Sequence, residues 1–268
     1  MHTEVAGLFD LKGKVAVVTG GARNLGFDAA SILAAAGCDV AITSRDRARA
    51  AAAAEDLGAR YGVDALAIDL DQTVLADVER CARAVTEWKG RADILVNNAG
   101  GGYGASPGNL FQRDPGDCAR LIELNLTGAL YCCREFGRGM AERGAGKIIN
   151  IASIAGLVGR DRRIYERSAM KSQPVDYAAA KAGVIGMTRD LAAFLGPMGV
   201  YVNAISPGGF ARNLASTFVR DYSDRTPLGR MGRDGIDLKG AILFLASPAS
   251  DYITGHNLVV DGGFTIWQ

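Results

Sequence analysis

Short β-branched apolar runs alternate with longer alanine-rich segments along the whole chain. The apolar runs have the length of strands, and the segments between them have the helical repeat of apolar positions. This alternation is typical of repeated strand–helix units built around a parallel sheet. The pattern predicts strands over residues 15–19, 39–43, 65–68, 93–96, 147–151, 200–205 and 257–260, and its helices include 25–36, 46–60 and 175–195.

The composition fits one α/β domain spanning residues 1–268, because 49% hydrophobic residues can bury a large core. Thirty basic against 29 acidic residues leave a net charge of +1, which argues against nucleic acid or a membrane surface and favours a small-molecule partner. No apolar run approaches the roughly 18 residues of a membrane span, and residues 1–14 have neither an apolar core nor a basic leader. We therefore expect a soluble, cytoplasmic protein.

The cysteines carry no sign of a disulfide framework. They number five, an odd set, and show neither C-x-x-C spacing nor a neighbouring histidine cluster. The same pattern argues against a zinc site. We interpret them as reduced, mostly buried apolar residues and predict no metal.

A glycine-rich turn, TGGARNLG over residues 19–26, follows the first predicted strand. In a dinucleotide-binding fold, glycines at this place allow a tight turn and close backbone approach, and the pyrophosphate lies at the N-terminus of the next helix. A glycine-rich turn can also be a plain connection, and the spacing here differs from GxGxxG. The position of this turn favours binding.

Tyr177 and Lys181 are four residues apart, so they share one face of any helix that carries them. An ammonium near a phenol favours the phenolate and lowers the tyrosine pKa from its ordinary value of about 10. Such a tyrosine is suited to general acid–base chemistry. The same spacing also occurs on solvated helices, so the pair alone does not decide.

Taken together, these motifs resemble the short-chain dehydrogenase/reductases. The family's TGxxxGxG turn, NNAG strand end, catalytic serine and YxxxK pair occur here in family order, nearly end to end. The segments that carry the resemblance are 19–26, 69–70, 97–100, 124–128, Ser153, Tyr177, Lys181 and 207–208. The resemblance implies a single-domain, doubly wound, Rossmann-like sheet with helices on both faces, and an oxidoreductase that uses NAD(P).

The resemblance also implies a catalytic role for four residues. Tyr177 transfers a proton to or from the substrate oxygen while a hydride moves between the substrate carbon and nicotinamide. Lys181 lowers the pKa of Tyr177 and holds the nicotinamide ribose hydroxyls, and Ser153 hydrogen-bonds the substrate oxygen. Asn125 supports a water that relays protons from Lys181. Ser153 follows a predicted strand, where open α/β sheets place ligands, although a serine there can also cap a turn.

The cofactor-binding residues implied by the resemblance come from several turns. They are Gly20, Arg23, Asn24, Leu25, Gly26, Ser44, Arg45, Asp69, Leu70, Asn98, Ala99, Gly100, Tyr177, Lys181, Pro207 and Gly208.

The separation of Ser153 from Tyr177 departs from the family pattern, because it is much longer than usual. Tyr165 stands nearer the usual place, but the residue four positions beyond it is Ala169, which carries no charge. Tyr177 is therefore the catalytic candidate. Residues 160–173 become a basic insertion at the mouth of the site, whose Arg160 and Arg163 are candidate contacts for a substrate carboxylate, phosphate or sulfonate. The alternative is a solvated loop whose charges maintain solubility.

Two further departures concern the cofactor. Asn24 stands where the family has the middle glycine of the turn, and asparagine tolerates positive φ, so the turn survives. After Pro207-Gly208 the family often has a threonine that touches the carboxamide, whereas this chain reads GFARN over 209–213. Carboxamide contacts there are unassigned.

Cofactor choice depends on the end of the second predicted strand. A carboxylate there accepts hydrogen bonds from the ribose of NAD, but this chain has Ser44 and Arg45. Arg45 and Arg23 can clamp the 2′-phosphate of NADP, although Asp46 lies close by. We prefer NADP over NAD.

The substrate is less constrained. Segments 206–210, 226–231 and 261–267 look like those of sugar, polyol and sugar-acid dehydrogenases, which predicts a secondary alcohol of a carbohydrate-like substrate, either neutral or, if residues 160–173 recognise it, anionic. Two alternatives stay open: a 3-oxoacyl thioester (acyl-carrier-protein) reductase, and a regulator that binds dinucleotide without turnover. The resemblance also implies a homo-oligomer, a tetramer rather than a dimer.

Overall fold

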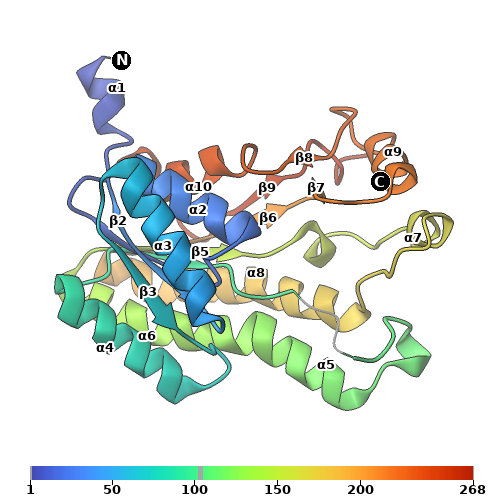
Figure 1. The fold of residues 1–268 in the computed structure, drawn as a ribbon, viewed down its shortest axis with the longest axis horizontal. Coiled ribbons are helices and arrows are strands. Elements are labelled where there is room, and N and C mark those ends of the chain that lie inside the picture. The colour runs from blue at the N-terminus through green and yellow to red at the C-terminus, as the bar shows by residue number, and fades with distance from the viewer. Residues whose placement is uncertain (1, 102–104, 268) are drawn as a thin grey trace.

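The computed structural model describes residues 2–101 and 105–267 (Figure 1). A seven-stranded sheet has the order β3-β2-β1-β4-β5-β6-β9, and every neighbouring pair is parallel. The strands are β1 Val15–Val18, β2 Asp39–Ser44, β3 Ala65–Asp69, β4 Ile94–Asn97, β5 Gly146–Ile151, β6 Val200–Pro207 and β9 Asn257–Val260. Each predicted strand is confirmed, with ends that differ by at most a few residues.

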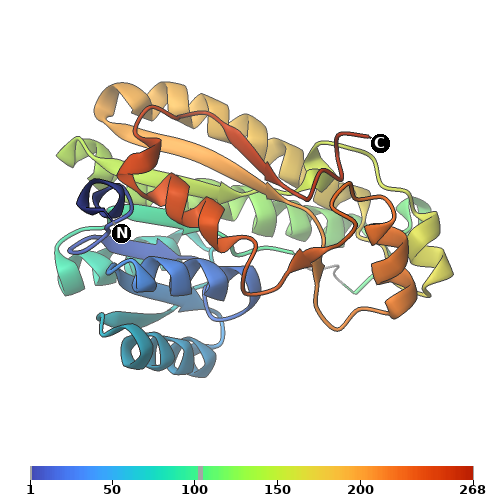
Figure 2. The same ribbon diagram turned by 90° about the horizontal axis from the view of Figure 1, so that it is seen from above.

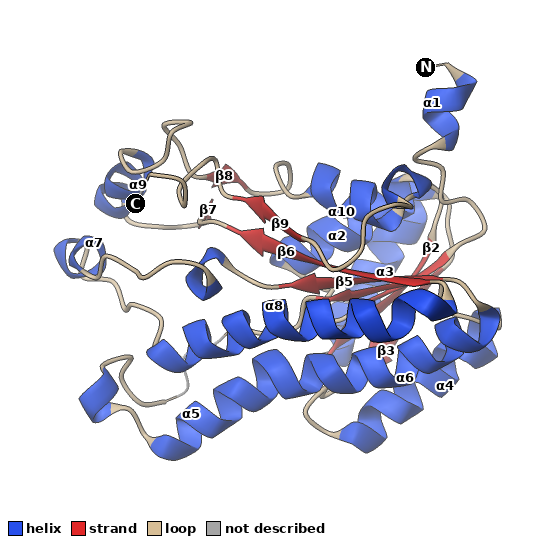
Figure 3. Cartoon of the chain, turned by 180° about the vertical axis from the view of Figure 1, so that it is seen from behind, coloured by secondary structure: helices blue, strands red, loops and turns tan. Residues whose placement is uncertain are grey.

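Helices cover both faces of the sheet, as Figures 2 and 3 show. One face packs against α2 Asn24–Ala35, α3 Arg47–Tyr61 and α10 Lys239–Ala246. The opposite face packs against α4 Leu75–Lys89, α6 Gly128–Arg143 and α8 Val175–Leu195. Because both faces are covered, the strands are nearly continuous apolar runs, and β1 and β4 are buried throughout. The predicted doubly wound fold is confirmed.

Shorter elements complete the chain. The helices are α1 Thr3–Gly7, α5 Pro115–Ile122, α7 Arg163–Arg167 and α9 Ser216–Ser223, with a π-helical turn η2 Glu123–Thr127 and 3₁₀ turns η1 Leu110–Gln112, η3 Ile154–Gly156, η4 Gly196–Met198 and η5 Pro248–Ser250. A separate two-stranded sheet, absent from the sequence-based prediction, joins β7 Phe210–Ala211 to β8 Gly232–Arg233. Within the described ranges, no helix has both the length and the apolar character needed to cross a membrane.

The sheet order places a ligand site at one edge. Strand β1 lies between β2 and β4, so the chain winds outward from β1 in both directions. In open α/β sheets the crevice for a ligand opens at such a switch point, beyond the carboxyl ends of the strands. The predicted insertion, residues 160–173, contains α7 and packs against α9 beyond this edge (Figure 1).

The cysteines agree with the prediction. All five are free thiols, and Cys118 alone of them is not fully buried. Their side chains therefore contribute apolar volume.

Candidate active site

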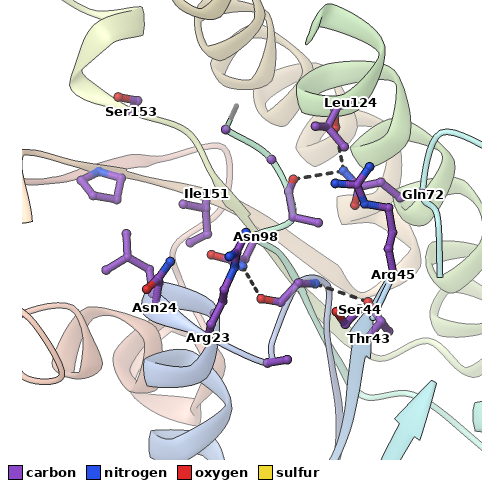
Figure 4. Close-up of a pocket in the computed structure, with 18 of the residues that line it drawn as sticks. Arg23, Asn24, Thr43, Ser44, Arg45, Gln72, Asn98, Leu124, Ile151 and Ser153 are labelled. Atoms are coloured by element: carbon purple, nitrogen blue, oxygen red, sulfur yellow. Dashed lines mark hydrogen bonds between the residues drawn. The ribbon is translucent and has the colours of Figure 1, made fainter. Parts of the chain in front are cut away.

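A cleft of about 600 Å³ opens at the carboxyl edge of the sheet (Figure 4). It is bordered by the turns after β1, β2, β4 and β5 and by the first turns of α2 and α8. The residues predicted to bind cofactor that line it are Gly20, Arg23, Asn24, Leu25, Gly26, Ser44, Arg45, Leu70, Asn98, Ala99, Gly100, Tyr177, Lys181, Pro207 and Gly208. The structure thus brings nearly the whole predicted set around one cavity.

Asp69 lies outside this cleft. It is the last residue of β3 and is exposed, whereas Leu70, the next residue, lines the cavity. Asp69 is therefore the one residue of the predicted cofactor set that does not line the cleft.

The glycine turn fits a dinucleotide pyrophosphate. Gly20 has φ of +60° and Asn24 has φ of +53°, so asparagine accepts the left-handed conformation as predicted. A Cβ on Gly26 would overlap the carbonyl oxygen of Gly20, so the helix can approach the turn this closely only with glycine. The N-cap of α2 makes no side-chain hydrogen bond, which leaves the first-turn N–H groups of the helix available for an anion. Asn98 fixes the turn from β4, donating from Nδ2 to the carbonyl oxygens of Thr19 and Gly20 at 2.9 and 3.1 Å.

Positive side chains gather at the end of β2. Arg23, Arg45 and Arg49 all line the cleft, and Figure 4 shows Arg23 and Arg45 approaching it from different elements. Asp46 is held by α3: its carboxylate accepts a 3.0 Å hydrogen bond from the backbone N–H of Arg49 and forms an ion pair with the Arg49 guanidinium. The negative charge near the predicted phosphate position is therefore partly neutralised.

Lys181 is buried on α8 with only 4% of its surface exposed. Its Nζ donates a 2.7 Å hydrogen bond to the carbonyl oxygen of Ile151 and lies 5.8 Å from the centre of the Tyr177 ring. Burial lowers the pKa of Lys181 from 10.5 to about 8. The predicted spacing therefore places a cation beside the phenol in a largely dry setting.

Asn125 supports the floor of the site from the π-helical turn η2. Its Oδ1 accepts a 2.7 Å hydrogen bond from the N–H of Gly101, and its Nδ2 donates to the carbonyl oxygen of Leu121 at 2.9 Å. A Cβ on Gly100 would lie 2.5 Å from Asn125 Oδ1 and 3.6 Å from Lys181 Nζ. The asparagine and the lysine thus approach the same point of the glycine segment after β4.

Ser153 caps a turn and also lies at the site. Its Oγ accepts a 3.1 Å hydrogen bond from the N–H of Ala155 and caps η3. It also borders the cofactor cleft and a second, adjoining cavity of about 240 Å³. The two cavities share Ser153, Gln173, Tyr177 and Gly208.

The arginines of the insertion do not form one cluster. The guanidinium carbon of Arg160 lies 5.5 Å from the centre of the Tyr177 ring, and Arg160 borders the second cavity. Arg163 borders neither cavity: its side chain is 76% exposed and forms an ion pair with Asp161. Arg167 is paired with Asp221. Of the two arginines predicted to contact the substrate, the structure brings Arg160 alone to the site.

Three polar contributions were absent from the sequence-based set. Gln72 donates from Nε2 to the carbonyl oxygens of Leu124 and Ala99, at 2.7 and 3.0 Å, and joins the β4 segment to η2. Arg212 borders the cofactor cleft from the segment just after β7. Arg113 forms a buried ion pair with Asp176, the residue before Tyr177. The sequence offered one signal for Gln72, because this polar residue closely follows Leu70, which was predicted to bind the cofactor. It offers no signal for the pairing of Arg113 with Asp176, which are far apart in the sequence.

The chain belongs to the short-chain dehydrogenase/reductase family, whose members are NAD(P)-dependent oxidoreductases acting on CH–OH groups. A family model described as enoyl-(acyl carrier protein) reductase matches residues 20–265. The chain is similar to the 3-oxoacyl-[acyl-carrier-protein] reductase FabG of Aquifex aeolicus, with 33% identity over 94% of this chain and 98% of that protein. It is 36% identical to the trans-4-hydroxycyclohexanecarboxylate dehydrogenase of Sinomonas cyclohexanicum, over 94% and 93% of the two chains.

A solved structure shares the whole fold. The gluconate 5-dehydrogenase from Burkholderia cenocepacia J2315, in complex with NADP and tartrate, superposes with a TM-score of 0.88 at 33% identity, covering 98% of this chain and 100% of that one. The predicted family and fold are confirmed, whereas these relatives differ in the substrates that their names give.

Proposed function

We propose that this protein transfers hydride between NADP(H) and a small secondary alcohol or ketone, with Ser153 and Tyr177 at the reacting oxygen. The observation that carries the proposal is that both residues border the cofactor cleft and the second cavity. A substrate in the second cavity would place its carbinol between these two side chains and the cleft. Hydride transfer requires the substrate carbon and the nicotinamide to be held close together, and two cavities that meet at Ser153 and Tyr177 allow this.

The chemistry follows from the side chains. When bound, the nicotinamide accepts or donates the hydride. In the oxidative direction the carbinol C–H bond breaks with its electron pair, the hydroxyl proton passes to the oxygen of deprotonated Tyr177, and a ketone forms. Ser153 donates a hydrogen bond to the substrate oxygen while its charge changes. Lys181 stabilises negative charge on the Tyr177 oxygen. Asn125 holds the glycine segment after β4 through its bond to Gly101 and supports the water that relays protons from Lys181.

The preference for NADP is supported by charge. Arg23, Arg45 and Arg49 border the cleft, and Asp46 is engaged as the cap of α3. Arginine matches the geometry of a phosphate with paired N–H donors. NAD remains the alternative cofactor, and much higher catalytic efficiency with NAD(H) than with NADP(H) in matched assays would contradict the proposal.

The proposed function also includes a substrate class. A gluconate dehydrogenase among the similar structures supports the carbohydrate interpretation made from the sequence. Reduction of a 3-oxoacyl thioester is a second candidate, favoured by the similarity to the Aquifex aeolicus reductase. A non-catalytic dinucleotide-binding regulator is a weaker candidate, because Asn125, Ser153, Tyr177 and Lys181 are all present and gathered at one site.

The test pairs turnover with binding. Tyr177→Phe should abolish NADP-dependent oxidation of any accepted secondary alcohol, while NADPH still binds with its usual fluorescence change. Tyr252→Phe is the matched control, because it removes the same hydroxyl from a fully exposed tyrosine that lies outside both cavities. A Tyr177→Phe protein as active as the parent would contradict the mechanism.

We also propose, from the resemblance alone, that the chain is a cytoplasmic homo-oligomer, a tetramer rather than a dimer. Light scattering of the purified protein would give the subunit number. A monomer at micromolar concentration would contradict the proposal.

A further inference from the structure

The second cavity is walled by apolar side chains from segments that are far apart in the sequence. The insertion contributes Ile164, Tyr165 and Met170, and the region around α9 contributes Leu214 and Phe218. The rest of the apolar wall comes from Ile154, Ala155, Val158, Phe210, Tyr222, Met231 and Phe264. The insertion that looked basic in the sequence therefore presents apolar side chains to the site, beside Arg160, Asp161 and Gln173.

Aromatic rings form a continuous series along this wall. The centres of Tyr165 and Phe218 are 5.0 Å apart, those of Phe218 and Tyr222 are 6.1 Å apart, and those of Tyr222 and Phe264 are 4.4 Å apart. The last pair is stacked, with an angle of 16° between the ring planes. Ring pairs at these distances stabilise one another, so the wall has a defined shape before anything binds.

Three of the polar side chains that border this cavity make bonds within the protein. The Tyr222 hydroxyl accepts a 2.6 Å hydrogen bond from the N–H of Gly209. Asp161 is paired with Arg163 and with Arg225, at 2.7 and 3.0 Å. Arg160 donates a 2.7 Å hydrogen bond to the carbonyl oxygen of Gln173. A ligand hydroxyl directed at this wall would meet mostly apolar atoms and lose hydrogen bonds to water.

We infer that the substrate is an alicyclic secondary alcohol or its cyclic ketone, with an apolar ring face against the aromatic wall and its carbinol at Ser153 and Tyr177. This inference rests on the proposed function, because it takes the second cavity as the substrate site. The volume of about 240 Å³ suits a single substituted ring and is below the roughly 300–1,000 Å³ of sites for larger ligands. A polyhydroxylated ring of the same size would carry hydroxyls on each face and is disfavoured, so the lining of this cavity argues against the carbohydrate candidate that the similar gluconate dehydrogenase supports.

The experiment compares two compounds that share one carbon skeleton. Cyclohexanol and myo-inositol are both six-membered rings with a secondary alcohol, and they differ in the hydroxyls on the other carbons. With purified full-length protein and NADP⁺, kcat/KM for cyclohexanol should exceed that for myo-inositol by at least about 100-fold, because an apolar site discriminates against buried hydroxyls. Acetoacetyl thioester is measured with NADPH beside cyclohexanone.

Substitutions in the wall of the second cavity test whether its apolar side chains bind the substrate, and the control variant separates this effect from a loss of folding. Leu214→Asn should lower kcat/KM for cyclohexanol by about tenfold or more while the affinity for NADPH is unchanged, since Leu214 is half-buried and borders only the second cavity. Phe111→Asn is the matched control, because Phe111 is 94% exposed and lies outside both cavities. Phe218→Asn tests the aromatic series, with thermal unfolding measured beside it.

The outcomes distinguish this inference from the function on which it rests. Faster turnover of myo-inositol, or of the thioester, than of the matching alicyclic compound would overturn the inference and leave the oxidoreductase function standing. Undiminished cyclohexanol turnover in Leu214→Asn would also overturn it. If no alcohol, ketone or thioester turns over although NADPH binds, the proposed function is contradicted and the inference falls with it.

Discussion

Lys181 donates a hydrogen bond from Nζ to the backbone oxygen of Ile151, the last residue of β5, across a distance of 2.7 Å. This bond ties α8 to the sheet edge and holds a cation close to the ring of Tyr177. The ammonium is fully buried, and burial lowers its pKa from 10.5 to about 8. A protonated lysine buried in this setting lowers the stability of the fold at neutral pH.

The sign of this effect predicts a pH dependence. Below pH 8 the lysine is protonated in both the folded and the unfolded states, so the full cost of its burial is present. Between the folded pKa of about 8 and the unfolded value of 10.5 the unfolded chain binds more protons, so this group makes stability rise with pH. The whole contribution is about 3 kcal/mol.

Lys181→Met isolates this contribution, because all other titrating groups are shared with the parent. The variant should unfold at pH 7 with a free energy equal to the parent's or up to about 2 kcal/mol higher, since the orphaned Ile151 carbonyl offsets part of the gain. The free energy of unfolding of the variant minus that of the parent should decrease by about 2–3 kcal/mol between pH 7 and pH 10. Urea denaturation at both pH values measures this difference, and an unchanged difference would contradict the burial argument.

Gly26→Ala should weaken dinucleotide binding. The added Cβ would overlap the Gly20 carbonyl and press on the side-chain amide of Asn98, so the turn that receives the pyrophosphate must move. We expect a loss of NADPH affinity of about tenfold or more, because misplaced backbone N–H groups lose charge-assisted hydrogen bonds. Fluorescence titration with NADPH measures it.

Gly186→Ala is the control for this substitution. Gly186 lies on α8 with no atom within 4 Å of an added Cβ, and it is exposed. Alanine there should raise the free energy of unfolding by about 0.5–1 kcal/mol and leave NADPH binding unchanged. Equal affinity in both alanine variants would show that the Gly26 turn tolerates a side chain.

The sheet and the position of the candidate catalytic residues could be predicted because local sequence determines them. Strand runs and a helix carrying Tyr177 and Lys181 are visible in residue order, and a turn with Asn24 at positive φ follows from the backbone tolerance of asparagine. The wall of the second cavity could not be predicted. Tyr165, Phe218 and Phe264 are brought together by tertiary packing, and no pattern within one segment indicates that they share a surface.

The orientation of the charged side chains in the insertion, residues 160–173, could not be predicted either. Arg163 and Arg167 were visible as basic residues, but the sequence did not show their partners Asp161 and Asp221, which hold them away from the two cavities. On an irregular segment, the direction in which a charged side chain points depends on such ion pairs. A basic composition therefore indicated a charged segment without indicating which of its faces the site would use.

The buried ion pair between Arg113 and Asp176 should be important for the stability of the site. The guanidinium donates to Asp176 Oδ2 from Nη2 at 2.8 Å and from Nε at 3.2 Å, and only 2% of the Arg113 side chain is exposed. Arg113→Met would leave the Asp176 carboxylate buried without this partner. We expect a loss of about 3–5 kcal/mol in the free energy of unfolding, and a lower kcat because Asp176 precedes Tyr177.

The matched comparison uses a surface pair. Arg138→Met removes an arginine that is 59% exposed and lies 3.8 Å from Glu135, and it should change stability by at most about 1 kcal/mol. The double variant Arg113→Met/Asp176→Leu should recover part of the loss, because no buried charge is then left unpaired. Equal effects of the Arg113 and Arg138 substitutions on urea denaturation would contradict the importance of the buried pair.

Arg45→Ala should convert the cofactor preference. Arg45 borders the cleft at the end of β2, and if it binds the 2′-phosphate, its loss removes charge-assisted hydrogen bonds that NADH never makes. The dissociation constant of NADPH should rise about 10- to 100-fold, while that of NADH stays nearly the same. Arg60→Ala is the control: Arg60 lies on α3, outside the cleft, and pairs with Asp56 at the surface. The NADPH effect should also diminish with added salt, since the contact is between charges. A parallel loss of affinity for both cofactors would instead place Arg45 at a group that the two dinucleotides share.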